Sequence, residues 1–492
     1  MIRAGLGVVY TRGLPFAAVT AVARRVLVLL LVTAAALIAT GTAGAFSRQE
    51  VRIASTDGTA LAATLTLPDA APPTGGWPAL IFMHGLGQNR ATGLAAAQAM
   101  AIGERYAVLA FDARGHGESG GLIGIDGPRE VADVRAVFSW LRDRPDVADA
   151  RIGGWGVSYG GGAAWNSLAA GVPWAALEIS ISWTDLFSAL APQGLAKTGV
   201  IAGFIGGLDP KRVDPEVFAI RDAAYRGDLG AVRPFTAARS SISALKNVRT
   251  PVFLMQGRRD FAFGLDQATR AFAALRGPKQ LWIGLHGHAP SSGVAADTPA
   301  MLAEGARWFD RFLRGDTARP LPRPVAIAPE RWRGQPVRFA GLPKVVVRQS
   351  TLAVRPAAAI AQSGRYRIPV AAGRGPLEVF GAPTVDVKAT ASGGWSRIVA
   401  VLSARTPAGK EIVVAGGGVP TRAGARTYRI ALSDQATFLP RGSRLTLTIG
   451  SSSLAQSPAN LLYLDLPFPS TARLRVTGGT VRVPALATPI SG

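Results

Sequence analysis

The sequence predicts a doubly wound α/β domain with a helical lid, followed by an all-β sandwich. From about residue 50 to 315, short apolar runs alternate with helical periodicity. Residues 184–247 contain no convincing strand, and a two-residue period begins beyond the Pro/Arg-rich stretch 318–336. The chain has 492 residues, about three times a usual domain length, so more than one folded unit is expected. We place the two domains at 46–330 and 331–492.

The first 45 residues have the order of an export signal. Two arginines at 24–25 precede an uncharged apolar run, 26–39, and the small triplet Ala-Gly-Ala follows at 43–45. We expect residues 1–45 to be cleaved and the protein to be secreted, periplasmic or attached to the cell envelope. An uncleaved membrane anchor is the alternative, because about 20 apolar residues can span a bilayer.

Seven short apolar runs are the strand candidates of the α/β domain. They lie at residues 61–67, 79–83, 107–111, 152–155, 177–181, 252–256 and 280–283. Between two of them, Val134, Phe138 and Leu141 fall on one face of a helix. Strands alternating with amphipathic helices predict a mostly parallel sheet covered on both faces.

The interval 184–247 interrupts this alternation with helical stretches rich in Phe, Leu and Ala. Structureless loops longer than about 15 residues are uncommon in compact domains. We therefore expect an inserted helical lid that covers the site.

The second domain contains about ten short runs separated by Gly, Pro, Ser and Asn. They lie at residues 345–347, 365–368, 384–387, 397–402, 411–414, 428–432, 445–449, 461–466, 473–476 and 481–483. Short strands with frequent turn signals predict a β-sandwich, which we expect to be a jelly roll.

Composition excludes several kinds of site. The chain has no Cys, so disulfides, thiolate metal sites and a cysteine nucleophile are all excluded. The formal charge is +23, and residues 331–492 hold 21 basic and 5 acidic residues. Such a basic domain could bind an anionic envelope surface. Nucleic-acid binding is not expected, because no recognition motif accompanies the charge.

The motif Gly-Val-Ser-Tyr-Gly at 156–160 is the strongest chemical signal. It follows a predicted strand and opens a helical stretch, as a nucleophile elbow does. Glycines are needed on both sides because strand and helix pack closely at this turn. Ser158 is therefore the candidate nucleophile.

A serine nucleophile needs an imidazole base, and the chain has four histidines. His84 and His116 precede Ser158, whereas serine hydrolases with this elbow run in the order Ser, acid, His. That order leaves His286 and His288. His84 and His116 are expected to have structural roles.

The acid should follow the strand that precedes this histidine, which makes Asp260 the first candidate. Asp266 is the alternative, although it is better placed to open the next helix. The backbone N–H groups of Tyr159 and Leu86 are the expected oxyanion-hole donors.

The pair His286 and His288 could instead bind a metal, since an H-x-H pair on a strand puts both rings on one side. No further ligands recur at fixed spacing. We expect no metal and no other cofactor.

These features resemble the α/β-hydrolase superfamily, and within it the Xaa-Pro dipeptidyl-peptidase and cocaine-esterase-like family. The resemblance rests on the opening Ser-Thr-Asp-Gly-Thr-Ala-Leu at 55–61, the Gly-x-Ser-Tyr-Gly-Gly elbow, and a trailing β-sandwich that includes Gly-Ala-Pro-Thr-Val-Asp-Val at 381–387. It implies acyl transfer through Ser158, Asp260 and His288, because the family's Gly-x-x-Gly-His pattern ends at His288. Relatives offer a tyrosine hydroxyl after the early core strand, but residues 84–89 contain none, so a backbone donor should replace it.

The resemblance implies an exported serine hydrolase acting on a small peptide or ester. A dipeptidyl-peptidase-like activity is the first expectation, and a carboxylic ester hydrolase is the alternative. A protein that binds the envelope through its basic sandwich is the alternative of another class. Dipeptide release needs a carboxylate for the substrate's α-amine, and four residues near or in the lid are candidates: Glu178, Asp185, Asp209 and Glu216.

Overall fold

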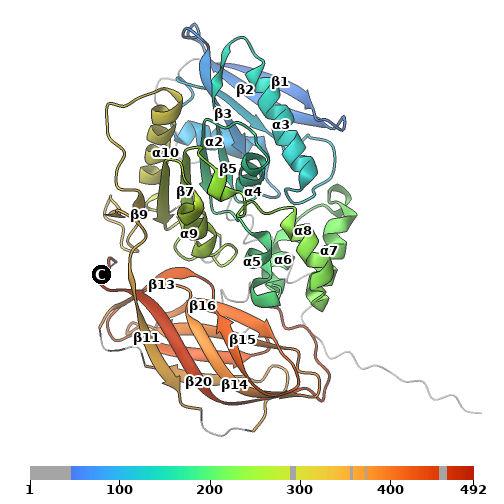
Figure 1. Cartoon of the computed structure of the whole chain (residues 1–492), viewed down its shortest axis with the longest axis vertical. Helices are drawn as coiled ribbons and strands as arrows, with labels where there is room; N and C mark the ends of the chain where they lie inside the picture. The colour runs from blue at the N-terminus through green and yellow to red at the C-terminus, as the bar shows by residue number, and fades with distance from the viewer. Residues whose placement is uncertain are drawn as a thin grey trace, which may run out of the picture.

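The computed structural model describes residues 46–288, 295–354, 358–371, 373, 375–453 and 462–491, and Figure 1 shows their arrangement. The predicted export signal, 1–45, lies outside the described residues. Within the described part of the chain, no helix has both the length and the apolar character needed to cross a membrane.

One ten-stranded mixed sheet organises the first region, with the strand order β1-β2-β4-β3-β5-β6-β7-β8-β9-β10. Strands β3 to β9 run parallel, while β1, β2 and β10 pair antiparallel with their neighbours. The strands are β1 (Phe46–Ala54), β2 (Ala60–Pro68), β3 (Trp77–Met83), β4 (Ala107–Phe111), β5 (Val147–Val157), β6 (Ala176–Ser180), β7 (Val252–Gly257), β8 (Lys279–Gly284), β9 (Val325–Ile327) and β10 (Val337–Phe339).

Helices cover both faces of this sheet, and each face has its own core. On one face lie α3 (Pro128–Arg142), α4 (Tyr159–Ala169) and α9 (Leu265–Ala274); on the other lie α2 (Arg90–Ala99) and α10 (Thr298–Leu313). The central strands are largely apolar because side chains on both faces are buried, as all five residues of β4 are. The mixed α/β architecture predicted from the sequence is confirmed.

Four α-helices fill the interval expected to be a lid, between β6 and β7. They are α5 (Leu186–Leu190), α6 (Thr198–Ile205), α7 (Pro215–Arg226) and α8 (Leu229–Ala237). Asp214 and Asp228 cap α7 and α8 by accepting first-turn N–H groups, and Gly227 ends α7 at φ 77°. In Figure 1 these green helices stand between the sheet and the second region. We call residues 184–247 the lid.

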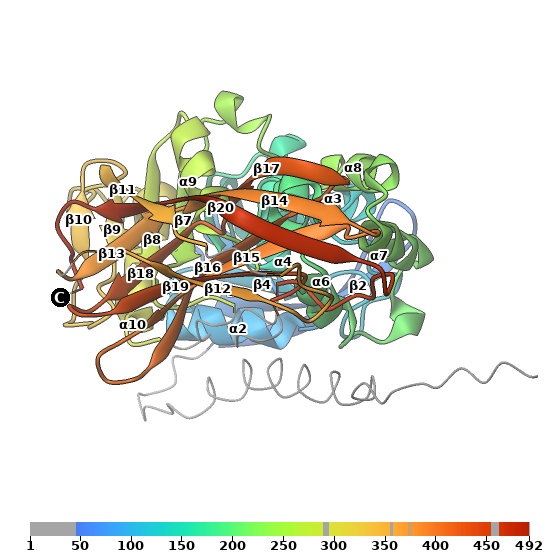
Figure 2. The same ribbon diagram turned by 90° about the horizontal axis from the view of Figure 1, so that it is seen from below.

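The second region is built from two antiparallel sheets (Figure 2). One sheet has the order β17-β14-β20-β13-β18 with β11 paired to β20, and the other has the order β12-β19-β15-β16. The strands are β11 (Val345–Leu352), β12 (Tyr366–Val370), β13 (Leu377–Gly381), β14 (Thr384–Ser392), β15 (Arg397–Arg405), β16 (Glu411–Pro420), β17 (Gly424–Ala431), β18 (Gln435–Leu439), β19 (Arg444–Gly450) and β20 (Arg473–Leu486). These strands make the region β-rich, as predicted. Inward side chains of both sheets share one core. The jelly-roll topology stays a prediction.

The observed strands differ from the expected pattern in several places; β1, β9, β13 and β18, for example, were not expected. The runs 473–476 and 481–483 are parts of the single long strand β20. The described residues of 461–466 form no strand, because their backbone bonds the lid instead: Leu462 O accepts from Gly199 N at 3.1 Å and Leu464 N donates to Thr198 Oγ1 at 2.8 Å. The α/β sheet also runs past residue 330 and ends in β10.

The turn after β7 lies directly against the second region. Arg258 in this turn forms a buried ion pair with Glu378 of β13, with 2.5 Å between Nη2 and Oε1. Gln435 Nε2 donates to the backbone oxygen of Asp260 at 2.9 Å, and Ala436 N donates to that of Arg258 at 2.6 Å. The β-rich region therefore supports the loop that carries the candidate acid.

Candidate active site

Ser158 occupies a strained turn between β5 and α4. Its φ of 53° and ψ of −110° place it in a conformation that residues with a β-carbon rarely adopt. A Cβ on Gly160 would lie 2.1 Å from Met83 O, and one on Gly156 would lie 2.3 Å from Gly160 O. Only glycine fits at either position, which explains the glycines of the motif.

The structure brings Ser158, His288 and Asp260 together from three separate loops. Ser158 Oγ lies 2.9 Å from His288 Nε2, and His288 Nδ1 lies 2.8 Å from Asp260 Oδ2. With a hydrogen on Nδ1, the ring donates to the carboxylate and leaves Nε2 free to accept the serine proton. This is the hydrogen-bond order of a serine-hydrolase triad.

The carboxylate of Asp260 is completely buried and fully hydrogen-bonded. Oδ1 accepts from the N–H groups of Ala262 and Phe263, both at 3.0 Å, and Oδ2 accepts from His288 N at 3.0 Å as well as from the ring. Burial opposes ionisation, but the attraction and hydrogen bonds of His288 and the backbone N–H group of Phe263 hold the pKa of Asp260 below its ordinary value. The group is therefore negative and can stabilise a protonated imidazole.

Two phenylalanines enclose the imidazole of His288. The ring centroids of Phe263 and Phe204 lie 5.3 and 5.7 Å from that of His288, both in edge-on arrangements. Phe263 belongs to the loop of the acid, whereas Phe204 comes from α6 of the lid. These contacts restrict the ring to the orientation in which both of its nitrogens are engaged.

The other candidates for base and acid do not contact Ser158. His286 is buried, and neither of its ring nitrogens has a hydrogen-bond partner among the described residues. Asp266 lies in the first turn of α9 and accepts from Gln267 at 2.8 Å, while burial raises its pKa. His288 and Asp260 are therefore the base and acid that the geometry favours.

His84 and His116 lie behind the elbow and have the surroundings of structural residues. His84 Nε2 accepts from Ala113 N at 3.0 Å, and its Nδ1 lies 2.8 Å from Gly85 O. His116 Nδ1 lies 3.0 Å from Arg114 O, and burial lowers the pKa of His116 to about 3. Both imidazoles are neutral and hold the loops after β3 and β4.

The two predicted oxyanion donors border the site. The backbone N–H groups of Leu86 and Tyr159 donate to no residue in the described part of the chain, and both residues line one cavity together with Ser158. Between them, Gly160 N donates to His84 O at 2.9 Å and joins the loop after β3 to the first turn of α4. This arrangement leaves two donors available for a substrate carbonyl oxygen.

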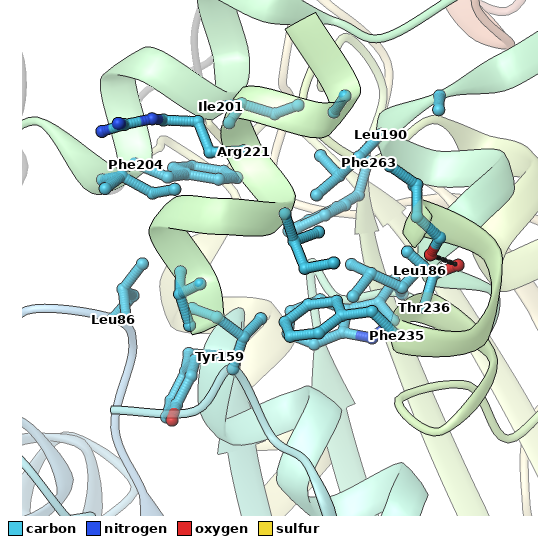
Figure 3. Close-up of a pocket in the computed structure, with 18 of the residues that line it drawn as sticks. Leu86, Tyr159, Leu186, Leu190, Ile201, Phe204, Arg221, Phe235, Thr236 and Phe263 are labelled. Carbon is cyan, nitrogen blue, oxygen red and sulfur yellow. Dashed lines mark hydrogen bonds between the residues drawn. The ribbon is translucent and has the colours of Figure 1, made fainter. Parts of the chain in front are cut away.

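A cavity of about 100 Å³ opens beside Ser158 and is bounded mainly by lid helices (Figure 3). Its walls include Leu186, Leu190, Phe204 and Phe235. Arg221 is the one charged residue among the described residues that line it, and this guanidinium is hydrogen-bonded to Asp222 at 2.7 Å. The cavity is therefore suited to an apolar group.

None of the four carboxylates expected to hold a substrate α-amine lines this cavity. Asp185 and Asp209 cap helices α5 and η3 (Pro210–Arg212) of the lid. Glu216 is exposed, and Glu178 is buried on β6 against Gly305 of α10. The described residues thus offer no anion beside Ser158 for a free amino group.

Comparison with known proteins finds a family model that matches part of the chain and solved structures that resemble most of it. Residues 57–206, which include Ser158, match the model of the X-Pro dipeptidyl-peptidase (S15) family. A CocE/NonD family hydrolase from Staphylococcus aureus superposes with a TM-score of 0.68 at 14% identity, over 90% of this chain and 94% of that one. The resemblance inferred from the sequence is confirmed. An α-amino acid ester hydrolase has a TM-score of 0.64 at 15% identity, over 92% of this chain and 99% of that one.

A further relative is similar in part only. The quorum-quenching protein AidA of Acinetobacter baumannii (strain MDR-ZJ06) is 31% identical over 145 residues, which are 26% of this chain and 46% of the relative. The chain thus spans about half the length of this curated relative. The family match and the structural neighbours together indicate a hydrolase enzyme.

Sequence reasoning missed the side chains that shape the site around the triad. Phe204 and Phe263 carry no motif, and the apolar pattern of the lid would fit an ordinary helical core equally well. Two contacts support the acid loop from far along the chain. Glu378 is 120 positions from its partner Arg258, and Gln435 is 175 positions from its partner Asp260. A contact of that separation has no signal in a single sequence.

Proposed function

We propose that the protein is a serine hydrolase that forms an acyl-enzyme on Ser158 and acts on carboxylic esters with an apolar acyl group. One observation carries the proposal: the hydroxyl of Ser158 lies 2.9 Å from His288 Nε2 and borders an apolar cavity. The hydrogen-bond order from Ser158 to Asp260 supports acyl transfer.

The reaction follows from the triad geometry. His288 Nε2 takes the proton of Ser158 as Oγ attacks the ester carbonyl, and the N–H groups of Leu86 and Tyr159 stabilise the negative oxygen that forms. Each such donor contributes about 3 kcal/mol to transition-state stabilisation. His288 then gives its proton to the leaving alcohol. In the second half of the reaction, His288 takes a proton from the water that attacks the acyl-enzyme and returns it to Ser158 Oγ as the carboxylic acid leaves. Asp260 stabilises the imidazolium throughout.

The cavity favours an ester with an apolar acyl chain over a dipeptide with a free amine. Each buried methylene of an acyl chain gains about 0.8 kcal/mol. A buried ammonium group without a carboxylate partner is strongly unfavourable. The apolar walls, with Arg221 already bonded to Asp222, therefore support an uncharged acyl group.

A dipeptidyl-peptidase activity is the second candidate, and the match of residues 57–206 to that family's model favours it. Peptide and ester hydrolysis use the same triad, so the distinction depends on substrate binding. An Xaa-Pro anilide and a series of p-nitrophenyl esters from acetate to octanoate distinguish the two. We expect kcat/KM to rise with acyl length and the anilide to be a poor substrate.

The acyl-enzyme itself is tested with a fluorophosphonate probe followed by peptide mapping. The expected result is a single adduct on Ser158, absent from Ser158→Ala and slowed in His288→Asn. An unlabelled wild-type protein, or a label on another serine, would contradict the proposal. Activity on the anilide with none on esters would support the serine-hydrolase assignment but contradict the ester specificity, and the protein would then be a peptidase.

We also propose that the protein is exported after cleavage behind Ala45. Support comes from the order of basic, apolar and small residues in 1–45. Amino-terminal sequencing of the protein from its native host should begin at Phe46. A full-length protein in the membrane fraction would favour the anchor instead. No comparison supports binding of the envelope surface, which stays a prediction.

A further inference from the structure

A second cavity lies at the other end of the α/β sheet from the triad. It has a volume of about 250 Å³ and is lined by the second half of α10, the segment 316–322, the start of β8 and β10. Gln280 lies at the amino end of β8, whereas His288 follows the carboxyl end of the same strand. The two cavities are therefore separated by the length of the strand.

Among the described residues, four arginines line this second cavity, and two of them lack an ionic partner; Arg307 and Arg319 are exposed. Arg338 forms a two-pronged ion pair with Glu304, and Arg307 lies 3.8 Å from the same carboxylate. Arg311 and Arg319 form no ion pair or hydrogen bond through their side chains with any residue that the structure describes. The cavity also includes Asp316, so its four arginines face two acids and leave a net charge of +2.

Two buried neutral donors line the same cavity without an acceptor. Gln280 is 3% exposed and Trp308 is 1% exposed. In the described part of the chain, neither Gln280 Nε2 nor Trp308 Nε1 has a hydrogen-bond partner. A buried donor without an acceptor costs about 1–3 kcal/mol, and a bound water or anion would remove that cost.

We propose that this cavity binds a small divalent oxyanion, either a phosphate group or a dicarboxylate. Two free guanidinium groups balance two negative charges, and Arg is the side chain best suited to oxyanions because its planar fork can donate two bonds. The indole and amide donors complete the coordination of oxygens that the arginines leave free. A volume of 250 Å³ is below the range of drug-sized ligand sites and fits a small anion.

The inference does not depend on the proposed hydrolase activity. Its residues lie on α10, the segment that follows it, the amino end of β8 and β10, and the triad uses none of them. Binding can therefore be measured on the full-length protein with no substrate present. Phosphate and dicarboxylates share two negative charges carried on oxygen atoms. Separate titrations distinguish the two ligand classes.

The test is isothermal titration calorimetry of inorganic phosphate and of succinate at low ionic strength, with acetate as the monovalent comparison. We expect saturable binding of at least one divalent anion with 1:1 stoichiometry, at least tenfold tighter than acetate. The double variant Arg311→Gln/Arg319→Gln should weaken that binding by at least tenfold. Trp308→Phe, which keeps the ring and removes the donor, should weaken it about threefold to tenfold.

The matched control is Arg426→Gln/Arg475→Gln, which removes the same charge from exposed strand positions of the β-rich region. It should bind the anion as the wild type does, and so should Ser158→Ala. Circular dichroism establishes that each variant is folded; where the double variant is not, Trp308→Phe decides. Absence of saturable binding in the wild type, equal loss in the arginine control, or loss in Ser158→Ala would overturn the proposal.

Discussion

The α/β region and the β-rich region contribute to the candidate site in different ways. The α/β region supplies all three members of the triad, on loops at the carboxyl ends of β5, β7 and β8. The β-rich region supplies no triad member, but Glu378 and Gln435 hold the acid loop from behind. The reacting side chains thus all belong to the α/β region, whereas part of the support that holds the acid loop in position comes from the β-rich region.

This division means that the two regions should respond differently to substitution. A change in a reacting group should abolish turnover and leave the fold intact, because the triad atoms contribute little to packing. A change in a supporting group should lower the free energy of unfolding more than it lowers the rate of the chemical step. The following predictions test that distinction, in order of expected size.

The largest effect is expected at His288. His288→Asn should lower kcat by about 10⁶-fold, because the remaining groups provide only the oxyanion hole and binding. The matched variant His286→Asn, two residues away and without contact to Ser158, should change kcat by less than tenfold. Steady-state kinetics on an ester substrate, with a thermal melt of each variant, measure both. A folded His286→Asn protein that is as inactive as His288→Asn would contradict the assignment of the base.

The second prediction concerns the ion pair between the two regions. Glu378→Gln leaves Arg258 buried without a counter-charge and should lower the free energy of unfolding by about 3–5 kcal/mol. Urea denaturation measures this loss. Glu411→Gln, at an exposed position on β16, is the control and should change the free energy by less than about 0.5 kcal/mol. Equal small losses in both variants would mean that the β-rich region does not support the acid loop.

The third prediction uses Asp434, which lies in the β-rich region next to the first turn of α9. Burial, reinforced by Asp266, raises the pKa of Asp434 to about 7. A carboxyl with a raised pKa favours folding while it is protonated, so its contribution is complete below about pH 4 and is lost as pH rises through 7. Between pH 5 and 8 the free energy of unfolding should fall by about 2 kcal/mol more in wild type than in Asp434→Asn.

Chemical denaturation at several pH values measures this difference. Asp69→Asn, at an exposed position, is the control and should keep the wild-type slope. If Asp434→Asn also keeps that slope, then Asp434 is ionised in the folded protein at neutral pH and the junction between the regions is more hydrated than the structure indicates.

The smallest effect is expected in the wall of the apolar cavity. Ala224→Phe on α7 should fill the space for the end of an acyl chain, and two excluded methylenes correspond to about 1.6 kcal/mol. The ratio of kcat/KM for octanoate and butyrate esters should therefore fall about tenfold. Ala219→Phe, on the exposed side of the same helix, should leave the ratio unchanged. An unchanged ratio in Ala224→Phe would place the acyl chain outside this cavity.

The sequence could predict the architecture and the reacting groups because both leave local signals. Parallel strands buried on two faces are continuous apolar runs, and the elbow at 156–160 allows few other interpretations. With four histidines, chain order alone reduced the base to His286 or His288. The structure brings His288 to 2.9 Å from Ser158, where sequence spacing could not choose between them without the family pattern.

The rest could not be predicted, because it depends on contacts between distant segments. The described residues of 461–466 have a strand-like pattern, yet their hydrogen bonds go to the lid. Glu178 stood among the possible amine-binding residues because it is near the lid in sequence, but it lies on β6 facing α10. Arg311 and Arg319 are scattered positive charges in a basic sequence, and only the fold gathers them around one hollow.

The support of the acid loop by β13 and β18 affects when activity can appear during synthesis and folding. Glu378 and Gln435 are synthesised more than a hundred residues after Asp260. A ribosome-bound chain therefore contains every reacting group before it contains the residues that support the acid loop. We therefore expect hydrolase activity only after the full chain has folded. Proteolytic cleavage between the two regions should abolish this activity, even though it removes no reacting residue.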